Sequence, residues 1–385
     1  MSVVHLFNPQ NDLALANGSP TFTPPLSALQ LANAGACLPM WYGKSDEYFF
    51  GAVNAGWYDE ICAAFEINVK PKMFPAEDDI PLPWGWSAHA RRYLADCGFD
   101  PHLLPSEEDI HRWRGLSSRE RSAKLIADFL EKNPVLVNGN VDESRPFITG
   151  TVDSALRHIN SVGIAMIKLP WSNAGRGQQV SDRTTPDELV RRLTGMIRRQ
   201  GSVEITPFYR KSLDFAMLWD AEGEFAGYSL FETDSHGGWT KNILISDSEI
   251  EHVIEENAGK SIDFEKIIND LSHIINEARK EDNFPLPTGV DFIVGDDSSA
   301  SKVIVPVEIN RRRTMGHVSH ALAQRFMSKD SRGTFSIVPA SNLQEPFHSV
   351  GNCRTEGLRL AEGKLDIVPP GGNFRFIVEV LQNRK

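Results

Sequence analysis

Two segments of the sequence carry side chains suited to chemistry on a phosphate group. In the first, IAMIKLPWSNAGRGQQV, Lys168 ends an apolar strand-like run and small residues follow it. A buried lysine charge is costly unless it has a partner. Backbone N–H groups of the loop, together with Arg176, can approach phosphate oxygens. The segment is therefore typical of a phosphate clamp, with a tight hairpin and a lysine reaching solvent as the alternative.

The second segment pairs TGVDFIVGDD with VIVPVEINRRRTMGH. Residues two apart on a strand share a face, so Glu308 and Asn310 point the same way. Asp291 faces Glu308 if the two strands form a hairpin through the polar turn GDDSSAS. Three such oxygen ligands suit Mg²⁺. The alternative is a set of buried carboxylates paired with the arginines at 311–313.

The composition narrows the class of protein. The 385 residues include 40 basic and 51 acidic side chains, for a net charge of −11. This charge argues against nonspecific binding to nucleic acid, which needs an excess of Lys and Arg. Four cysteines show no CxxC pair, no apolar run reaches the ~20 residues of a membrane span, and the first residues lack a secretory pattern. We expect a cytoplasmic protein with no membrane partner.

Local patterns predict the elements that position these residues. A strand at Val3–Phe7, a helix after Pro24-Pro25 and a strand at 37–43 indicate a small α/β domain. Helices are expected from Ser117, from Val152 and from Thr185, the last ending at Gly201. A hairpin has its tip at AEGEF, and a long helix precedes the Asp291 strand. We expect four units, 1–116, 117–202, 203–330 and 331–385, the last of obscure role.

Asn8, Asn11 and Asp12 follow the end of the first predicted strand. Ligands bind at this position in open α/β sheets, although an Asx turn explains the same residues. The side chain of His317 lies close in sequence to the arginines, and a packing role is the simpler interpretation for it.

The order of these motifs resembles the ATP-grasp superfamily, which includes D-alanine–D-alanine ligase, biotin carboxylase and glutathione synthetase. IKLPWSNAGRG is similar to the family's phosphate loop, and EIN followed by RRR is similar to its E-x-N-x-R ending. The resemblance covers roughly residues 117–325. It implies an α/β (α+β) fold in which two α+β subdomains clasp ATP, preceded by a small Rossmann-like domain.

The resemblance also implies site residues. Lys168 would contact the α- and β-phosphates, beneath a loop that contains Asn173, Gly175, Arg176 and Gly177. The hinge strand SVEITPFY would read adenine through the backbone of Pro207 and Tyr209, with Glu204 or Thr206 as the hinge acid. Asp214 would bind the ribose and Lys241 the γ-phosphate. Asp291, Glu308 and Asn310 would hold Mg²⁺, and Arg312 would lie near the transferred phosphate. A further ATP-binding cation falls to Arg119, Arg121 or Lys124.

The function that this resemblance implies is an ATP- and Mg²⁺-dependent ligase. ATP would phosphorylate a carboxylate, and an amine or thiol would attack the acyl phosphate. The alternatives are a small-molecule kinase of the same family and a nucleotide-binding sensor without turnover. The sequence leaves open the identity of both substrates and the oligomeric state, a homo-oligomer included.

Overall fold

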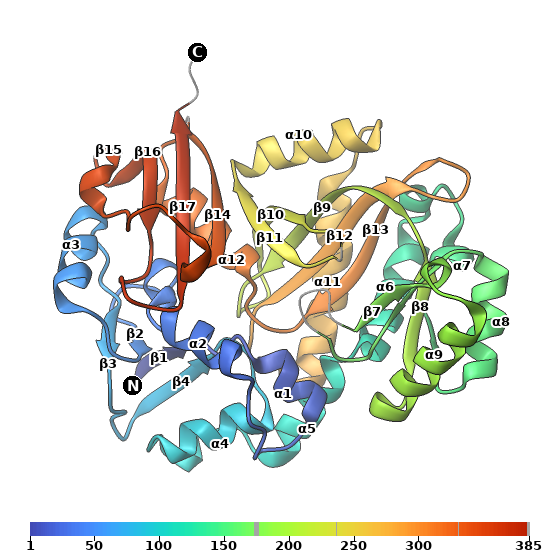
Figure 1. Ribbon diagram of the computed structural model, residues 1–385, viewed down its shortest axis with the longest axis horizontal. Coiled ribbons are helices and arrows are strands. Elements are labelled where there is room, and N and C mark those ends of the chain that lie inside the picture. The colour runs from blue at the N-terminus through green and yellow to red at the C-terminus, as the bar shows by residue number, and fades with distance from the viewer. Residues whose placement is uncertain (173–176, 236, 330, 383–385) are drawn as a thin grey trace.

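The structure is a computed structural model that describes residues 1–172, 177–235, 237–329 and 331–382. These ranges form a mixed α/β fold built on three sheets (Figure 1). A parallel sheet comes first in the chain, and two antiparallel sheets follow it. The fold class predicted from the sequence is therefore confirmed.

The N-terminal unit is a four-stranded parallel sheet in the order β3-β2-β1-β4. Its strands are β1 (Ser2–Leu6), β2 (Tyr48–Phe50), β3 (Lys70–Lys72) and β4 (Asp79–Pro83). Its helices are α1 (Asn11–Asn17), α2 (Leu26–Ala34), α3 (Ala55–Phe65), α4 (Ala88–Asp96) and α5 (Glu107–Leu116). β1 leads into α1, and the carbonyl of Trp84, just after β4, accepts from the Arg313 N–H at 3.0 Å.

One predicted strand in this unit is wrong. The segment 37–43 contains the 3₁₀ helix η1 (Leu38–Trp41), and the second strand of the sheet comes later, at β2. All four residues of η1 are buried. A short apolar run of this kind has no period that separates a strand from a buried helical turn, and Pro39 starts such a turn readily.

The second unit is a small antiparallel sheet in the order β5-β8-β6-β7. Its strands are β5 (Phe147–Thr149), β6 (Ala165–Lys168), β7 (Gln178–Val180) and β8 (Val203–Pro207). Helices α6 (Arg119–Lys132), α7 (Val141–Ser144), α8 (Val152–Val162) and α9 (Pro186–Gln200) belong to the same stretch of chain. The predicted caps hold, since Thr185 accepts from the backbone of Glu188 at the start of α9 and Gly201 ends that helix.

The third sheet has nine antiparallel strands in the order β13-β12-β9-β10-β11-β14-β17-β16-β15. The two predicted hairpins are β9 (Arg210–Trp219) with β10 (Phe225–Thr233) and β12 (Thr288–Asp296) with β13 (Lys302–Asn310), and β11 (Trp239–Leu244) follows β10. Its helices are α10 (Asp247–Ala258), α11 (Phe264–Asp282) and α12 (Met315–Ala321). The remaining strands are β14 (Ser331–Pro339), β15 (Arg354–Glu356), β16 (Arg359–Asp366) and β17 (Phe374–Gln382).

The C-terminal strands join two parts of the molecule. In Figure 1 they lie beside the N-terminal unit, while α8, α9 and the small sheet lie at the opposite end. One apolar core contains Phe7 and Trp41 of the N-terminal unit together with Phe335 and Phe376 of the C-terminal strands. A second core lies between the large sheet and helices α6, α10 and α11. The small sheet has its own core with α8 and α9.

No helix in the described part of the chain combines the length and the apolar character needed to cross a membrane.

Candidate active site

Strands β12 and β13 bring the predicted metal ligands together. Their register places Asp291 directly opposite Glu308, and Asn310 Nδ2 donates to Asp291 Oδ2 at 2.9 Å. Burial and then the negative charge of Glu308 raise the pKa of Asp291 to about 7. The described residues contain no group of three His, Cys, Asp or Glu side chains that could hold a metal. The predicted ligand set at β12 and β13 consists of two carboxylates, Asp291 and Glu308, and the amide of Asn310. Such oxygen ligands fit a hard cation such as Mg²⁺.

Lys168 links the small sheet to this strand pair. Its side chain is almost completely buried at the end of β6, opposite Glu204 on β8. Its Nζ donates to the Val307 carbonyl of β13 at 3.1 Å and lies 3.4 Å from Glu204 Oε1. The lysine charge is thus balanced by a carboxylate that is only 1% exposed. Lys168 and the metal ligands, which are far apart in sequence, meet at one place.

Arg119, at the start of α6, is the cation that completes this group. Its Nη2 donates to Glu308 Oε1 at 2.6 Å, and its Nη1 donates to Ser172 Oγ at 2.7 Å and to the Leu169 carbonyl at 3.0 Å. Arg119 therefore touches both a predicted metal ligand and the start of the phosphate loop. The sequence alone does not show which of Arg119, Arg121 and Lys124 is the further ATP-binding cation, because all three lie on the same helix.

The other two candidate cations on α6, Arg121 and Lys124, lie elsewhere. Arg121 Nη2 is 3.2 Å from Glu281 Oε2 at the end of α11, and Lys124 is exposed. Both point away from the strand pair, so among these three side chains Arg119 alone reaches Glu308.

The three arginines that follow β13 go to three different places. Arg311 is buried near the Phe284 ring, with its guanidinium carbon 6.0 Å from the ring centroid. Arg313 lies 4.0 Å from the centroid of Tyr42. Arg312 alone among them forms an ion pair within the described residues, and its partner is Asp12 of α1, at 2.7 Å. The carboxylates of β12 and β13 are therefore not paired with this arginine run.

The two residues that flank the predicted phosphate loop, Leu169 and Gly177, are joined by a backbone hydrogen bond. Leu169 N–H donates to the Gly177 carbonyl at 3.0 Å, and Lys168 pairs with Gln178 in the β6–β7 register. Gly177 has a φ of +76°, a conformation that favours glycine. Asn173, Gly175 and Arg176, which the resemblance places in the loop, lie outside the described residues.

The predicted nucleoside contacts lie along β8 and β9. Asp214 is on the same face of the large sheet as Asp291, because Asp291 pairs with Ala216 and residues two apart share a face. Lys211 Nζ and Thr233 Oγ1 contact its Oδ2 at 2.6 and 2.9 Å. Pro207 ends β8, and Tyr209 packs into the core beneath the large sheet.

Lys241 is not brought to this group. Ala216 pairs with Ser229, and Phe231 pairs with Asn242, which places Asn242 on the Asp291 face of the sheet. The side chain of Lys241, one residue before, points to the other face. There its Nζ lies 3.1 Å from Glu232 Oε2. The sequence resemblance to a γ-phosphate lysine could not reveal this, because strand registers set the face.

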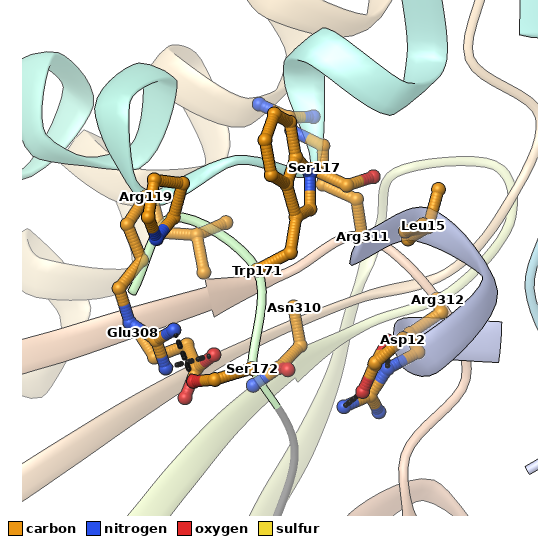
Figure 2. Close-up of a pocket in the computed structure, with 12 residues that line it drawn as sticks. Asp12, Leu15, Ser117, Arg119, Trp171, Ser172, Glu308, Asn310, Arg311 and Arg312 are labelled. Atoms are coloured by element: carbon orange, nitrogen blue, oxygen red, sulfur yellow. Dashed lines mark hydrogen bonds and ion pairs between the residues drawn. The ribbon is translucent and has the colours of Figure 1, made fainter. Parts of the chain in front are cut away.

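A cavity lies at the junction of the three units, and Arg119, Glu308 and Asn310 line it, whereas Lys168, Asp214 and Asp291 do not. It is lined by Asp12 and Leu15 of α1, Ser117 and Arg119 near α6, Pro170–Ser172 of the loop, and 308–312 of β13 and its continuation. Figure 2 shows Asn310 between two charged pairs, Arg119 with Glu308 on one side and Asp12 with Arg312 on the other. Asp12, for which the sequence indicates no definite role, is the charged side chain that the N-terminal unit supplies to this cavity. Its position after the end of β1 is the feature of the sequence that indicates a ligand-binding place.

Comparison with known proteins gives structural likenesses only. Neither a model of a known protein family nor a curated protein matches the sequence. N5-carboxyaminoimidazole synthetase from Staphylococcus aureus, complexed with ADP, is 10% identical with a TM-score of 0.47, and the match covers 100% of this chain and 94% of that one. A biotin carboxylase–ATP analogue complex from Campylobacter jejuni has the same identity and TM-score, with coverage of 100% and 88%.

A third likeness is D-alanyl-alanine synthetase A from Vibrio cholerae, which is 10% identical with a TM-score of 0.38, over 84% of this chain and 93% of that one. At this distance the function rests on the residues of the chain itself.

Proposed function

We propose that this protein is an ATP- and Mg²⁺-dependent ligase of the ATP-grasp kind, which activates a carboxylate as an acyl phosphate for attack by an amine or thiol. One observation carries the proposal. Two buried cations from the middle of the chain, Lys168 and Arg119, contact β13 beside the Asp291–Glu308–Asn310 oxygen set, Lys168 at the Val307 carbonyl and Arg119 at Glu308. Cations beside a hard-metal site are what phosphoryl transfer requires.

In this proposal residues 117–202 and 203–330 are the two units that hold the nucleotide between them. Asp291, Glu308 and Asn310 would bind Mg²⁺, which when bound neutralises phosphate charge and orients the reacting group. Lys168 and Arg119 would hold phosphate oxygens under the loop at 173–177. Glu204 would keep Lys168 charged, Asp214 would bind the ribose, and the backbone of Pro207 and Tyr209 would meet the adenine.

Arg312 would face the acceptor. A carboxylate is already ionised at neutral pH, so it needs a cation and no general base. Its oxygen would take the γ-phosphoryl group while the bond from that phosphorus to ADP breaks. An amine or thiol would then attack the acyl carbon, and phosphate would leave. The substrates are thus a small carboxylic acid and a small amine or thiol.

The first test is nucleotide affinity in matched lysine variants. Lys168→Ala removes a charged hydrogen-bond donor to phosphate, so affinity for MgADP should fall by at least about tenfold, the effect of ~1.5–3 kcal/mol. Lys241→Ala is the control: its side chain is on the opposite sheet face, so binding should match the wild type. Titration calorimetry measures both, beside thermal melts. Equal affinity for all three proteins would remove Lys168 from the site.

The second test concerns the reaction. The protein is incubated with ATP, Mg²⁺ and pooled carboxylic acids, and hydroxylamine is added to trap acyl phosphate. ATP-dependent hydroxamate with release of ADP supports the ligase. If a broader metabolite pool gives a stable phosphorylated alcohol, the protein is a small-molecule kinase and not a ligase. If no pool gives ADP, the protein is a nucleotide-binding sensor without turnover.

A further inference from the structure

The Arg312–Asp12 pair uses only part of the arginine's bonding capacity. Arg312 Nε donates to Asp12 Oδ1 at 2.8 Å, and Nη2 donates to Asp12 Oδ2 at 2.7 Å. Nη1 donates to the Arg313 carbonyl at 3.2 Å. A guanidinium carries five N–H donors. Within the described part of the chain, two N–H donors of Arg312 therefore remain for another anion. The planar two-point contact with Asp12 fixes their direction.

Asp12 has support that does not depend on Arg312. Asn8, just before α1, exchanges two hydrogen bonds with Gly85: its Nδ2 donates to the Gly85 carbonyl at 2.9 Å, and Gly85 N–H donates back to Oδ1 at 3.3 Å. Arg114 Nε donates to the Leu15 carbonyl of α1 at 2.6 Å. The helix that carries Asp12 is thus fastened at both ends to the N-terminal unit.

Arg312 has other carboxylates nearby. Glu308 and Arg312 line one cavity together with Asp12, and Asp291 lies opposite Glu308 in the β12–β13 register. Arg312 nevertheless forms no ion pair with Asp291 or Glu308 among the described residues, whereas its contact with Asp12 is direct. Without Asp12, its nearest attraction would be toward the two carboxylates of β12 and β13.

We propose that Asp12 is a positioning residue that holds Arg312 away from Asp291 and from the second oxygen of Glu308, whose Oε1 already accepts from Arg119, so that these oxygens stay available to a divalent cation. The inference rests on the metal site of the proposed function. The N-terminal unit would then affect metal binding through Asp12, although this unit supplies no metal ligand. A guanidinium released onto Glu308 or Asp291 would compete with the cation for the same oxygens.

The test measures Mn²⁺ binding by electron paramagnetic resonance in the presence of saturating ADP. The proteins are the wild type, Asp12→Asn, Arg312→Gln and the double variant, with Glu308→Gln as the metal-site control. We expect Asp12→Asn to weaken Mn²⁺ binding by about tenfold, because the cation must then displace a hydrogen-bonded contact between Arg312 and a carboxylate, which is worth more than an exposed ion pair. The double variant should return to within about threefold of the wild type, because the competing cation is gone. ADP binding without metal should not change.

The rescue separates positioning from a structural role. If the double variant binds Mn²⁺ as weakly as Asp12→Asn, or if Asp12→Asn binds as well as the wild type, the inference is overturned. The proposed metal site survives either result, provided that the wild type binds Mn²⁺ and Glu308→Gln does not. A wild type that binds no Mn²⁺ overturns both. If Asp12→Asn does not fold, Asp12→Ser replaces it, and unfolding of both beside a folded Arg312→Gln shows that Asp12 is architectural.

Discussion

His317 lies at the start of α12, and its ring bonds the backbone at both nitrogens. Nδ1 is 3.1 Å from Thr314 N and Nε2 is 3.2 Å from the Trp219 carbonyl. A carbonyl only accepts, so Nε2 carries the proton and Nδ1 accepts from the Thr314 N–H. Burial, followed by the charge of Arg313, lowers the pKa of His317 to about 3. The side chain therefore caps a helix as a neutral ring.

The sign of the pH effect follows from this pKa. The unfolded chain takes up a proton near the ordinary value of about 6.5, whereas folded His317 does not until about pH 3. Stability from this residue is complete above about pH 6.5 and is lost as the pH falls. Between pH 7 and 5 the wild type should lose about 2 kcal/mol more free energy of unfolding than His317→Gln. Gln keeps the capping box but cannot titrate.

Urea denaturation of both proteins at several pH values checks this prediction. The two proteins share every other titrating group, so their difference isolates His317. Parallel curves of stability against pH would show that the ring is already charged or exposed in the folded protein.

The sequence indicates which side chains carry the chemistry more readily than it indicates which residues they contact. Asp291 opposite Glu308 was predictable because a short polar turn joins their two strands, so the pairing is local. Lys168 bonding Val307 was not, because 139 residues separate them and no local pattern fixes which strand passes the lysine. Arg119 could not be separated from its helix neighbours for the same reason.

At the scale of elements, the junction between α1 and the end of β4 is tightly packed. A Cβ added at Gly85 would lie 2.3 Å from Asn11 Nδ2 and 2.6 Å from its Cγ. Asn11 is buried and belongs to α1. The side chain cannot move far, so a methyl group here must displace the helix that carries Asp12.

Gly85→Ala should therefore destabilise the protein by about 1–3 kcal/mol, the range for overpacking. Gly115→Ala is the matched control, since a Cβ at that position in α5 meets nothing within 4 Å. A helical Gly→Ala change should stabilise by about 0.5–1 kcal/mol. Chemical denaturation midpoints of the two variants should move in opposite directions. A shift in the same direction for both would mean that α1 yields to the methyl group.

Elements with end signals were predictable, and those without were not. α9 begins at a Thr-Pro pair with Glu188 following and ends at Gly201, and the structure reproduces these limits. The turn at η1 carries apolar residues with no such signal, and its predicted strand was wrong. Capping is a property of a few adjacent residues, whereas the state of a short apolar run is decided by the core around it.

At the scale of the whole molecule, the last strands are part of the main architecture. β14 pairs with β11, and β17 pairs with β14, which extends the sheet that carries the metal residues. Phe376 of β17 is fully buried and lies 6.1 Å from Phe7 of the N-terminal unit, measured between ring centroids. The sequence shows FRFIVEVLQ as a strand, but its neighbours come from distant segments, so its role was hidden.

Phe376→Ala should cost about 3–5 kcal/mol of folding free energy, because it leaves a cavity between two units. Leu381→Ala on the same strand is the control: Leu381 is 64% exposed, so its loss should stay within about 0.5 kcal/mol. Thermal or urea unfolding measures both. A small effect at Phe376 would mean that the N-terminal unit and the C-terminal strands are not one folding unit.

The order of strands in the large sheet also bears on solubility at high concentration. Its two edge strands are β13 and β15. The unpaired backbone groups of an edge strand can pair with a strand of another chain. On β13, Pro306 offers no N–H, and the carbonyls of Lys302 and Val307 already accept from Asn138 and Lys168. β15 is three residues long, fully exposed, and charged at both ends. The strand that holds Glu308, a proposed metal ligand, is therefore also one that resists amyloid-like stacking.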